Sequence, residues 1–328
     1  MKVLLPLVVV TGLFLLGLVG PTVGLGWVFG VLLPYIAATL FVAGLVTRVL
    51  SWAKVPVPFR ITTTCGQQKS LPWIRQNKLD NPHTTLATVG RMALEVLCFR
   101  SLMRDTKSRM VEGKLVYGTD LSLWLGGMAM HWAMLAIVVR HLRFFTHPVP
   151  SVVTFLDGLD GFLEVGLPVF YVSSAAFIVA VAYLFSRRLR SPQVRYISLV
   201  GDYFPLFLLL GIGLSGFWLR HMTRTDIVAV KQLVLGLTHF APVVPESISP
   251  LFYGHMLLVC VLVGYLPFSK LTHMAGVFLS PTRNLANNNR RIRHVNPWNY
   301  PVKVHGYPEY EDELREKMKS AGIPVEKE

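Results

Sequence analysis

The chain has 328 residues, of which 52% are hydrophobic and 15% are charged, and its formal net charge is +14. Its apolar runs of about eighteen or more residues exclude a purely soluble protein, because such runs are too long for strands and indicate membrane spans. The basic residues lie between these runs, which argues against nucleic-acid binding, and the three distant cysteines (Cys65, Cys98 and Cys260) predict neither a disulfide framework nor a zinc or iron–sulfur site.

Six apolar segments predict transmembrane helices, and together they predict an all-α membrane protein. In chain order they cover residues 3–19, 27–50, 121–144, 165–185, 197–218 and 251–277. The first segment also has the lysine start and apolar core of a signal peptide. It lacks an A-x-A-like cleavage site and another span follows at once, so we favour a retained helix.

The charges of the connections predict how the spans are oriented. Lys and Arg gather in the 51–115 connection, in 186-SRRLRSPQVR-195 and in the tail. The 146–164 connection carries Asp157, Asp160 and Glu164 and has no Lys or Arg. Because basic loops stay on the cytoplasmic side, we expect a multi-pass protein of the cell (cytoplasmic) membrane with both termini in the cytoplasm.

Four regions follow from this arrangement. They are two N-terminal transmembrane helices (1–50), a cytoplasmic loop (51–115), a four-helix membrane region (116–277) and a cytoplasmic tail (278–328). The loop has helix-like sequence around 84–115 and is longer than most connectors. A surface for a cytoplasmic partner fits it at least as well as a solvated connector does, and the tail is expected to lie against the same partner.

Four histidines lie in or at the ends of the third and sixth predicted spans, where lipid offers an imidazole no hydrogen-bond partner. His131 and His141 are ten residues apart on the third span, and His255 and His273 are eighteen apart on the sixth. The two spans are antiparallel, so His141 and His255 lie toward the outer side and His131 and His273 toward the inner side. Two such pairs predict two haems b, each held by two neutral imidazoles.

The spacings of the two pairs do not match. On continuous helices they measure about 15 Å and about 27 Å, and tilt, haem slant or a kink must absorb the difference of about 12 Å. A single membrane histidine is more simply explained by a hydrogen bond to a neighbouring helix. Four that pair by topology favour haem ligands. His221 and His239 are also eighteen residues apart, and they remain second-choice ligands or residues near a quinol pocket.

Several stretches resemble the cytochrome b (gamma) subunit of membrane nitrate reductases. They are 33-LPYIAATLFVAGLVTRVLSW-52, 131-HWAMLAIVVRH-141, 187-RRLRSPQVR-195 and 254-GHMLLVCVLVGYLPFSKLTHMAG-276, with 267-PFSKLTH-273 the most specific. The resemblance implies that His131, His141, His255 and His273 ligate two haems b in the pairs given above. It also places 221-HMTRTD-226 in a periplasmic loop, which makes His221 a poorer ligand candidate.

The first span and the insertion containing 65-CGQQKSLPWI-74 depart from nitrate reductase. With them, the whole chain resembles the M subunits of sulfite-reductase-associated membrane redox complexes (DsrMKJOP). This resemblance implies an iron–sulfur cytoplasmic partner related to heterodisulfide reductase and further subunits of a membrane redox complex. It also implies a trisulfide-bearing carrier of dissimilatory sulfate reduction as the electron sink.

The residues and the resemblance together predict a dihaem subunit that oxidises menaquinol near the outer haem and passes electrons through the inner haem to the cytoplasmic partner. Arg140 and Arg143 flank His141 and are predicted to bind haem propionates, unless they extend to lipid headgroups. Candidate proton acceptors, by position, are Asp157, Asp160, Glu164 and His221. Each carboxylate is more simply interpreted as a solvated charge of the outer loop.

Two alternatives remain open from the sequence. A haem-free membrane anchor or transporter would use the same histidines to relay protons, although the chain has no clear internal repeat. The same haems could also reduce quinone, because ligand identity does not fix the reduction potential when both haems have two histidine ligands.

Overall fold

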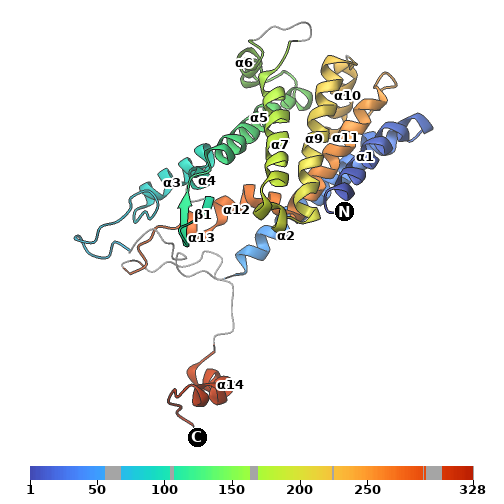
Figure 1. The fold of residues 1–328 in the computed structure, drawn as a ribbon. Coiled ribbons are helices and arrows are strands. Elements are labelled where there is room, and N and C mark those ends of the chain that lie inside the picture. The colour runs from blue at the N-terminus through green and yellow to red at the C-terminus, as the bar shows by residue number, and fades with distance from the viewer. Residues whose placement is uncertain are drawn as a thin grey trace.

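The computed structural model describes residues 1–55, 68–103, 107–162, 169–223, 225–290, 292 and 305–327 of the chain. Within these residues, six helical segments are long and apolar enough to cross a membrane: Leu4–Val23, Val28–Ala53, Leu121–Phe145, Val172–Arg190, Val200–His221 and Pro250–Phe268. They form one bundle (Figure 1). The prediction of an all-α membrane protein with six transmembrane helices is confirmed.

The long helices of the bundle are α1 (Leu4–Val19), α2 (Leu33–Ala53), α5 (Leu121–Phe145), α7 (Val172–Arg190), α9 (Val200–His221) and α11 (Pro250–Tyr265). The shorter helices are α3 (Thr85–Cys98), α4 (Arg100–Met103), α6 (Ser151–Asp160), α8 (Pro192–Ile197), α10 (Ile227–Thr238), α12 (His273–Leu279), α13 (Pro281–Asn284) and α14 (Tyr307–Ser320). The strands β1 (Lys107–Val111) and β2 (Lys114–Gly118) pair antiparallel as a hairpin.

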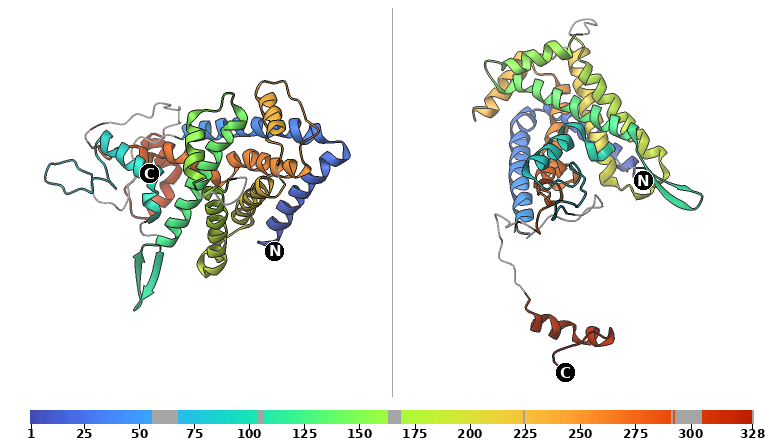
Figure 2. Two further views of the ribbon diagram at one scale, coloured as in Figure 1. Left: turned by 90° about the horizontal axis from the view of Figure 1, so that it is seen from above. Right: turned by 90° about the vertical axis from the view of Figure 1, so that its left-hand side faces the viewer.

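Helix α11 contacts α1, α2 and α9, whereas α5 packs mainly against α7. Figure 2 shows the blue N-terminal helices beside the orange α11. At the α1–α11 contact, a Cβ added to Gly17 would lie 2.8 Å from the Cα of Gly254. The two glycines allow backbone-to-backbone approach, as small residues do in pairs of membrane helices. Helix α1 is therefore packed into the bundle and is not a loose N-terminal segment.

The sixth predicted span is wrong at its C-terminal end. Helix α11 stops at Tyr265, and two 3-10 turns (Leu266–Phe268 and Lys270–Thr272) separate it from α12, which begins at His273. Pro267 has no backbone N–H, and Ser269 adopts an extended conformation in which its side chain accepts a hydrogen bond from the N–H of Leu271. Hydrophobicity continues through this segment, but the helix does not.

The fourth predicted span is displaced. We expected it over 165–185, but α7 begins at Val172 and continues to Arg190. Three arginines (Arg187, Arg188 and Arg190) lie in its last turn, where positive side chains interact favourably with the helix dipole. Hydropathy alone ends the span before these residues, so it misses the basic last turn.

The insertion between α2 and α5 is partly helical and partly a hairpin. The predicted helical character is confirmed in α3 and α4 but wrong over β1 and β2. The described part of the insertion is fixed to the segment after α13 through amides, because the Asn287 side chain donates to Asn81 Oδ1 at 2.6 Å and its backbone N–H donates to Pro82 at 2.7 Å. All residues of β2 are exposed.

Asp120 joins the start of α5 to the end of α7. Its Oδ1 accepts the N–H of Leu123 at 3.0 Å, and its Oδ2 accepts from Arg187 at 2.7 Å. A hydrogen bond from the Ser122 hydroxyl, together with Arg187, holds the pKa of Asp120 well below its usual range. The negative charge therefore stabilises the folded state above the unfolded pKa of about 4, and this contribution is lost as the pH falls toward the lower folded pKa.

We expect Asp120→Ala to lower the free energy of unfolding by about 1–2 kcal/mol at pH 7, because α5 loses its N-terminal cap. Asp120→Asn keeps a side chain that caps well and should cost less. The apparent melting temperature of the purified protein, measured against pH, checks this. The difference between wild type and Asp120→Asn should shrink below about pH 4, and a difference that is constant with pH would contradict the role of the charge.

Candidate functional site

The structure brings His131 and His273 together. His131 lies on α5, and His273 is the first residue of α12. Their ring centroids are 6.0 Å apart, with an interplanar angle of 79°. Two imidazoles that bind one metal ion from opposite sides, with bonds of about 2 Å, have centroids about 6 Å apart. The separation of this inner pair therefore fits two axial ligands of one iron.

His141 and His255 form the second pair predicted from topology. His141 is in the last turns of α5, and His255 is in the second turn of α11. No ring contact joins them among the described residues, so their pairing stays the prediction made from topology. The His255 ring lies against Gly216 of α9, where an added Cβ would be 3.1 Å from His255 Cε1. A larger residue at Gly216 would push this ring out of place.

The break after α11 means that the spacing of a continuous helix does not apply to His255 and His273. On a continuous helix, His255 and His273 would share one face and lie about 27 Å apart. In the structure they belong to different helices, separated by the turns around Pro267. The sequence left tilt, haem slant or a kink as ways to absorb the difference between the two spacings. The structure has a complete break of the helix at this point.

Each of the four histidines uses Nδ1 for a hydrogen bond within the protein. Three of these bonds go to backbone carbonyls: His131 to Gly127 at 2.8 Å, His141 to Ile137 at 2.7 Å and His273 to Lys270 at 2.9 Å. The fourth joins His255 to the hydroxyl of Ser215 at 2.8 Å. Such partners fix the tautomer and leave Nε2 as the coordinating atom, as is usual for metal-bound histidine.

Within the described residues, no group of three or more His, Cys, Asp or Glu side chains converges in a way that could hold a bare metal ion. A haem requires fewer protein ligands, because its porphyrin ring supplies four nitrogens to the iron and the chain needs to supply only two. The donor set of each pair, two imidazoles with engaged Nδ1 atoms, fits haem iron.

The charged residues at the outer end of α5 are partnered with helix α6. The Arg140 guanidinium lies 3.2 Å from Asp160 and 3.6 Å above the ring of Tyr171, and both side chains of the ion pair are 8% exposed. Arg143 forms an ion pair with Asp157. The expectation that Asp157 and Asp160 are solvated loop charges is therefore wrong, because α6 folds back onto α5, where it buries Asp160 and half-buries Asp157 against the arginines. Glu164 lies outside the described residues.

Several polar atoms of this cluster remain unsatisfied. Among the described residues, the buried atoms without a hydrogen-bond partner are Arg140 Nε, Arg143 Nε, Asp157 Oδ1 and His221 Nε2. Buried donors of this kind normally have an acceptor. Arg140 Nε and Arg143 Nε are N–H donors, and His221 Nε2 is a donor when it carries a proton. These atoms can therefore bind an anionic group close to His141.

The second-choice histidines are not in ring contact with the four paired ones. His221 ends α9 and packs against Phe217 at 4.5 Å and Phe170 at 5.7 Å between ring centroids. His239 follows α10 and uses Nδ1 on the carbonyl of Leu235. Neither has a histidine ring opposite it in the described part of the chain, so neither matches the close approach of His131 and His273. The same is true of His141 and His255, so their choice over His221 and His239 still rests on the predicted topology.

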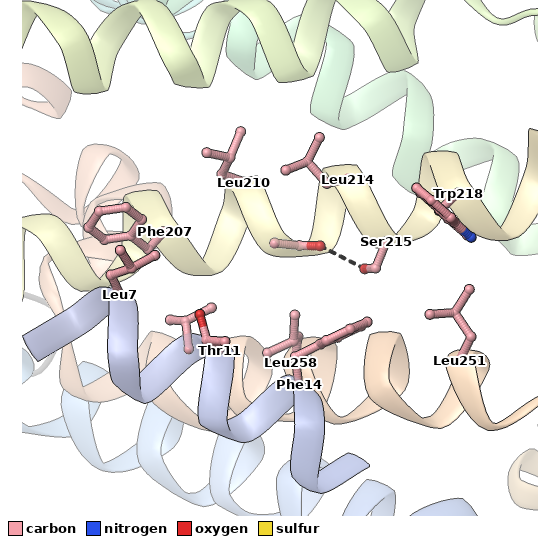
Figure 3. Close-up of a pocket in the computed structure, with 12 residues that line it drawn as sticks. Leu7, Thr11, Phe14, Phe207, Leu210, Leu214, Ser215, Trp218, Leu251 and Leu258 are labelled. Atoms are coloured by element: carbon pink, nitrogen blue, oxygen red, sulfur yellow. Dashed lines mark hydrogen bonds between the residues drawn. The ribbon is translucent and has the colours of Figure 1, made fainter. Parts of the chain in front are cut away.

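An apolar cavity of about 560 Å³ lies between α1, α9 and α11. Figure 3 shows Ser215 at its wall, with Leu7, Thr11 and Phe14 of α1 on the facing side. The Ser215 hydroxyl donates a hydrogen bond to the carbonyl of Gly211 at 2.7 Å and, as described above, is hydrogen-bonded to His255. Sequence patterns do not indicate Ser215, since a serine within an apolar helix gives no signal until its partner histidine is known.

Six apolar helices define a multi-pass membrane protein, and the close approach of His131 and His273 is typical of the cytochrome b-like class. Residues 112–294 match the nitrate reductase gamma subunit family, and the chain belongs to this family. The match begins at the hairpin and includes α5, α7, α9, α11 and α12, and so all four paired histidines.

Two relatives extend the similarity to most of the chain. The cytochrome b-like subunit of an Hdr-like menaquinol oxidoreductase from Archaeoglobus fulgidus is 43% identical over 281 residues, which is 84% of either chain. The protein of the same description from Archaeoglobus profundus is 40% identical over 273 residues, 81% of either chain. Since the family match itself begins at residue 112, these relatives also share much of the N-terminal third.

Proposed function

We propose that this chain is the dihaem cytochrome b subunit of a menaquinol-oxidising membrane complex. His131 and His273 hold an inner haem b, and His141 and His255 hold an outer one. The observation that carries the proposal is the close approach of His131 and His273, at 6.0 Å between ring centroids, together with four histidines whose Nδ1 atoms are satisfied inside the protein. Bound haem supplies one-electron transfer, and the protein supplies ligands, dielectric and charge.

Arg140 and Arg143 hold the propionates of the outer haem. Both guanidinium groups are already paired with carboxylates of α6, yet each keeps a buried Nε without an acceptor. A propionate oxygen satisfies such a donor with a charge-assisted hydrogen bond. The ion pairs with α6 therefore orient the arginines and do not replace the propionates.

Menaquinol docks in the apolar cavity between α1, α9 and α11. The cavity is lined almost entirely by hydrocarbon, which suits the ring and isoprenoid chain of a quinol. Its wall includes Ser215, which contacts His255 directly, so a bound quinol lies beside the outer pair. Oxidation to menaquinone releases two electrons and two protons, and the chain must accept or conduct the protons.

The candidate proton acceptors differ in their surroundings. Asp160 is fully occupied, since it pairs with Arg140 and accepts from the backbone and hydroxyl of Ser173 at 2.7 and 2.6 Å. Asp157 Oδ1 and His221 Nε2 are buried without partners. These two remain candidates to take up a proton, and Asp160 becomes a poor one.

The inner pair faces the cytoplasm, and both termini lie there, as the loop charges predict. The partner on that side is an iron–sulfur subunit related to heterodisulfide reductase, within a redox complex of the DsrMKJOP type that serves sulfate or sulfite respiration. The names of the Archaeoglobus relatives support an Hdr-like partner. The exposed β1–β2 hairpin offers such a partner an unpaired strand edge.

Purified protein should contain two haems b by the pyridine haemochrome assay, and a reduced short-chain menaquinol analogue should reduce them. Thr11→Trp fills the cavity from α1, so we expect quinol-driven reduction to slow by roughly tenfold, equivalent to about 1.4 kcal/mol. Dithionite should still reduce both haems fully. Leu15→Trp is the matched control, because Leu15 is an exposed α1 residue outside the cavity lining.

The outcomes separate the rival functions. Protein made with haem available but containing none would leave the membrane anchor or proton-relay function standing. Two haems that menaquinol fails to reduce would favour quinone reduction or another donor. An unchanged rate in Thr11→Trp would place the quinol elsewhere.

A further inference from the structure

The insertion reaches the inner histidine pair through residues 97–103, called the α3–α4 turn below. The Phe99 ring lies in this turn, and its centroid is 4.8 Å from that of His131, at an interplanar angle of 47°. Leu102 lies against Gly127, whose carbonyl holds His131 Nδ1, and a Cβ added to Gly127 would be 3.0 Å from Leu102 Cδ2. The α3–α4 turn therefore covers one side of the His131 ring and of its backbone partner.

Two tryptophans of α5 fix the α3–α4 turn in place. Trp124 Nε1 donates to the carbonyl of Cys98 at 2.7 Å, and Trp132 Nε1 donates to the carbonyl of Leu97 at 3.1 Å. These carbonyls end α3, where backbone oxygens have no partner within the helix. The helix that carries His131 thus also holds the turn that covers it.

The α3–α4 turn is also tied to the element that carries His273. Glu95 of α3 is buried, accepts the backbone N–H of Ser101 at 3.0 Å and forms an ion pair with Arg283 of α13. Helix α13 directly follows α12, which begins at His273. One short segment of the insertion is therefore fixed to both ligand-bearing elements of the inner pair.

Phe99 adopts a backbone conformation that favours glycine. Its φ and ψ are both 46°, in the left-handed region, where it ends α3. Glycine is the usual residue at such a helix end, and a bulky aromatic side chain there is uncommon. Its ring is half-buried against His131. A strained residue whose side chain meets a functional group points to a role for that side chain.

We propose that Phe99 is a positioning residue of the inner haem site, which excludes water from the His131 side and raises the reduction potential of that haem. The inference rests on the proposed haem function. A bis-histidine haem carries one more positive charge when oxidised, and water stabilises that charge better than an apolar cover does. Loss of the Phe99 ring should therefore favour the oxidised inner haem and leave the outer haem unaffected.

The test is a redox titration of both haems in purified wild type and Phe99→Gly. Glycine suits the left-handed backbone, so this variant removes the ring without adding strain. We expect the ratio of reduced to oxidised inner haem, at a fixed ambient potential, to fall about tenfold, which is about 59 mV for a one-electron couple. Phe99→Leu keeps an apolar cover and should stay close to wild type.

Two further variants keep the test decisive. Trp132→Phe removes the hydrogen bond to Leu97 and should shift the inner haem in the same direction by less. Phe144→Ala is the matched control at the other site, because Phe144 packs on His141 at 5.8 Å between ring centroids, and it should shift only the outer haem. Unchanged potentials in both Phe99→Gly and Trp132→Phe, or equal shifts of the two haems, would overturn the proposal. A wild type without haem would instead overturn the function on which it rests.

Discussion

Purified His131→Ala and His273→Ala protein should each contain one haem b per chain, and the same haem should be missing from both. Their ring centroids are 6.0 Å apart, so under the proposed function removal of either would leave one haem iron with a single protein ligand. His141→Ala and His255→Ala should each lose the other haem. Pyridine haemochrome gives the number of haems, and reduced-minus-oxidised spectra with a redox titration show which one remains.

The second-choice histidines provide the control. His239→Ala should retain both haems, because His239 is outside the predicted ligand set. Its Nδ1 bonds the carbonyl of Leu235 just as the Nδ1 atoms of three predicted ligands bond carbonyls, so this variant tests the choice of ligands directly. If His131→Ala and His273→Ala lost different haems, the pairing would be wrong even if all four residues were ligands. If both haems remained in any of the four variants, the histidine replaced in that variant would not be a ligand, and His221 would be the next candidate.

Asp160→Ala should lower the free energy of unfolding by about 3–5 kcal/mol, because it leaves the Arg140 guanidinium buried without its counter-charge. Both side chains of the pair are 8% exposed, and Asp160 also accepts two hydrogen bonds from Ser173. The apparent melting temperature of the purified protein measures the change. Replacement of both Arg140 and Asp160 by leucine removes both charges and should restore part of the lost stability.

An exposed ion pair serves as the control for Asp160. Lys327 and Asp312 lie 3.0 Å apart in the C-terminal region, with about half of each side chain exposed to solvent. Solvent screens such pairs, so Lys327→Ala should leave the melting temperature unchanged. Equal changes in melting temperature at the two sites would show that burial does not make the Arg140–Asp160 pair more important for stability than an exposed pair.

Hydrophobic runs and loop charges were enough to predict the six spans, since each span must satisfy its own backbone in lipid. The same signal failed at Pro267, where the chain stays apolar but leaves the helix. It also failed over residues 107–118, where an alternating pattern in a polar loop is too short to distinguish a hairpin from a helix. At both places, the local residues and not the hydropathy determine the secondary structure.

Topology predicted that His131 would lie beside His273, because antiparallel helices bring opposite ends together, and the structure places their ring centroids 6.0 Å apart. The partners of these histidines could not be chosen in this way. Ser215 is forty residues from His255 in sequence, and Phe99 reaches His131 only because two tryptophans of α5 hold the end of α3. Such contacts depend on how separate elements pack, which a single sequence does not reveal.

The break at Pro267 also gives the two histidine pairs different mechanical supports. His141 and His255 both belong to long apolar helices, α5 and α11, each of which packs against another long helix of the bundle. His273 is carried by a surface helix that follows two tight turns and is tied to α3 through the neighbouring Arg283. The separation of the His131 and His273 rings therefore depends on contacts made outside the six long apolar helices.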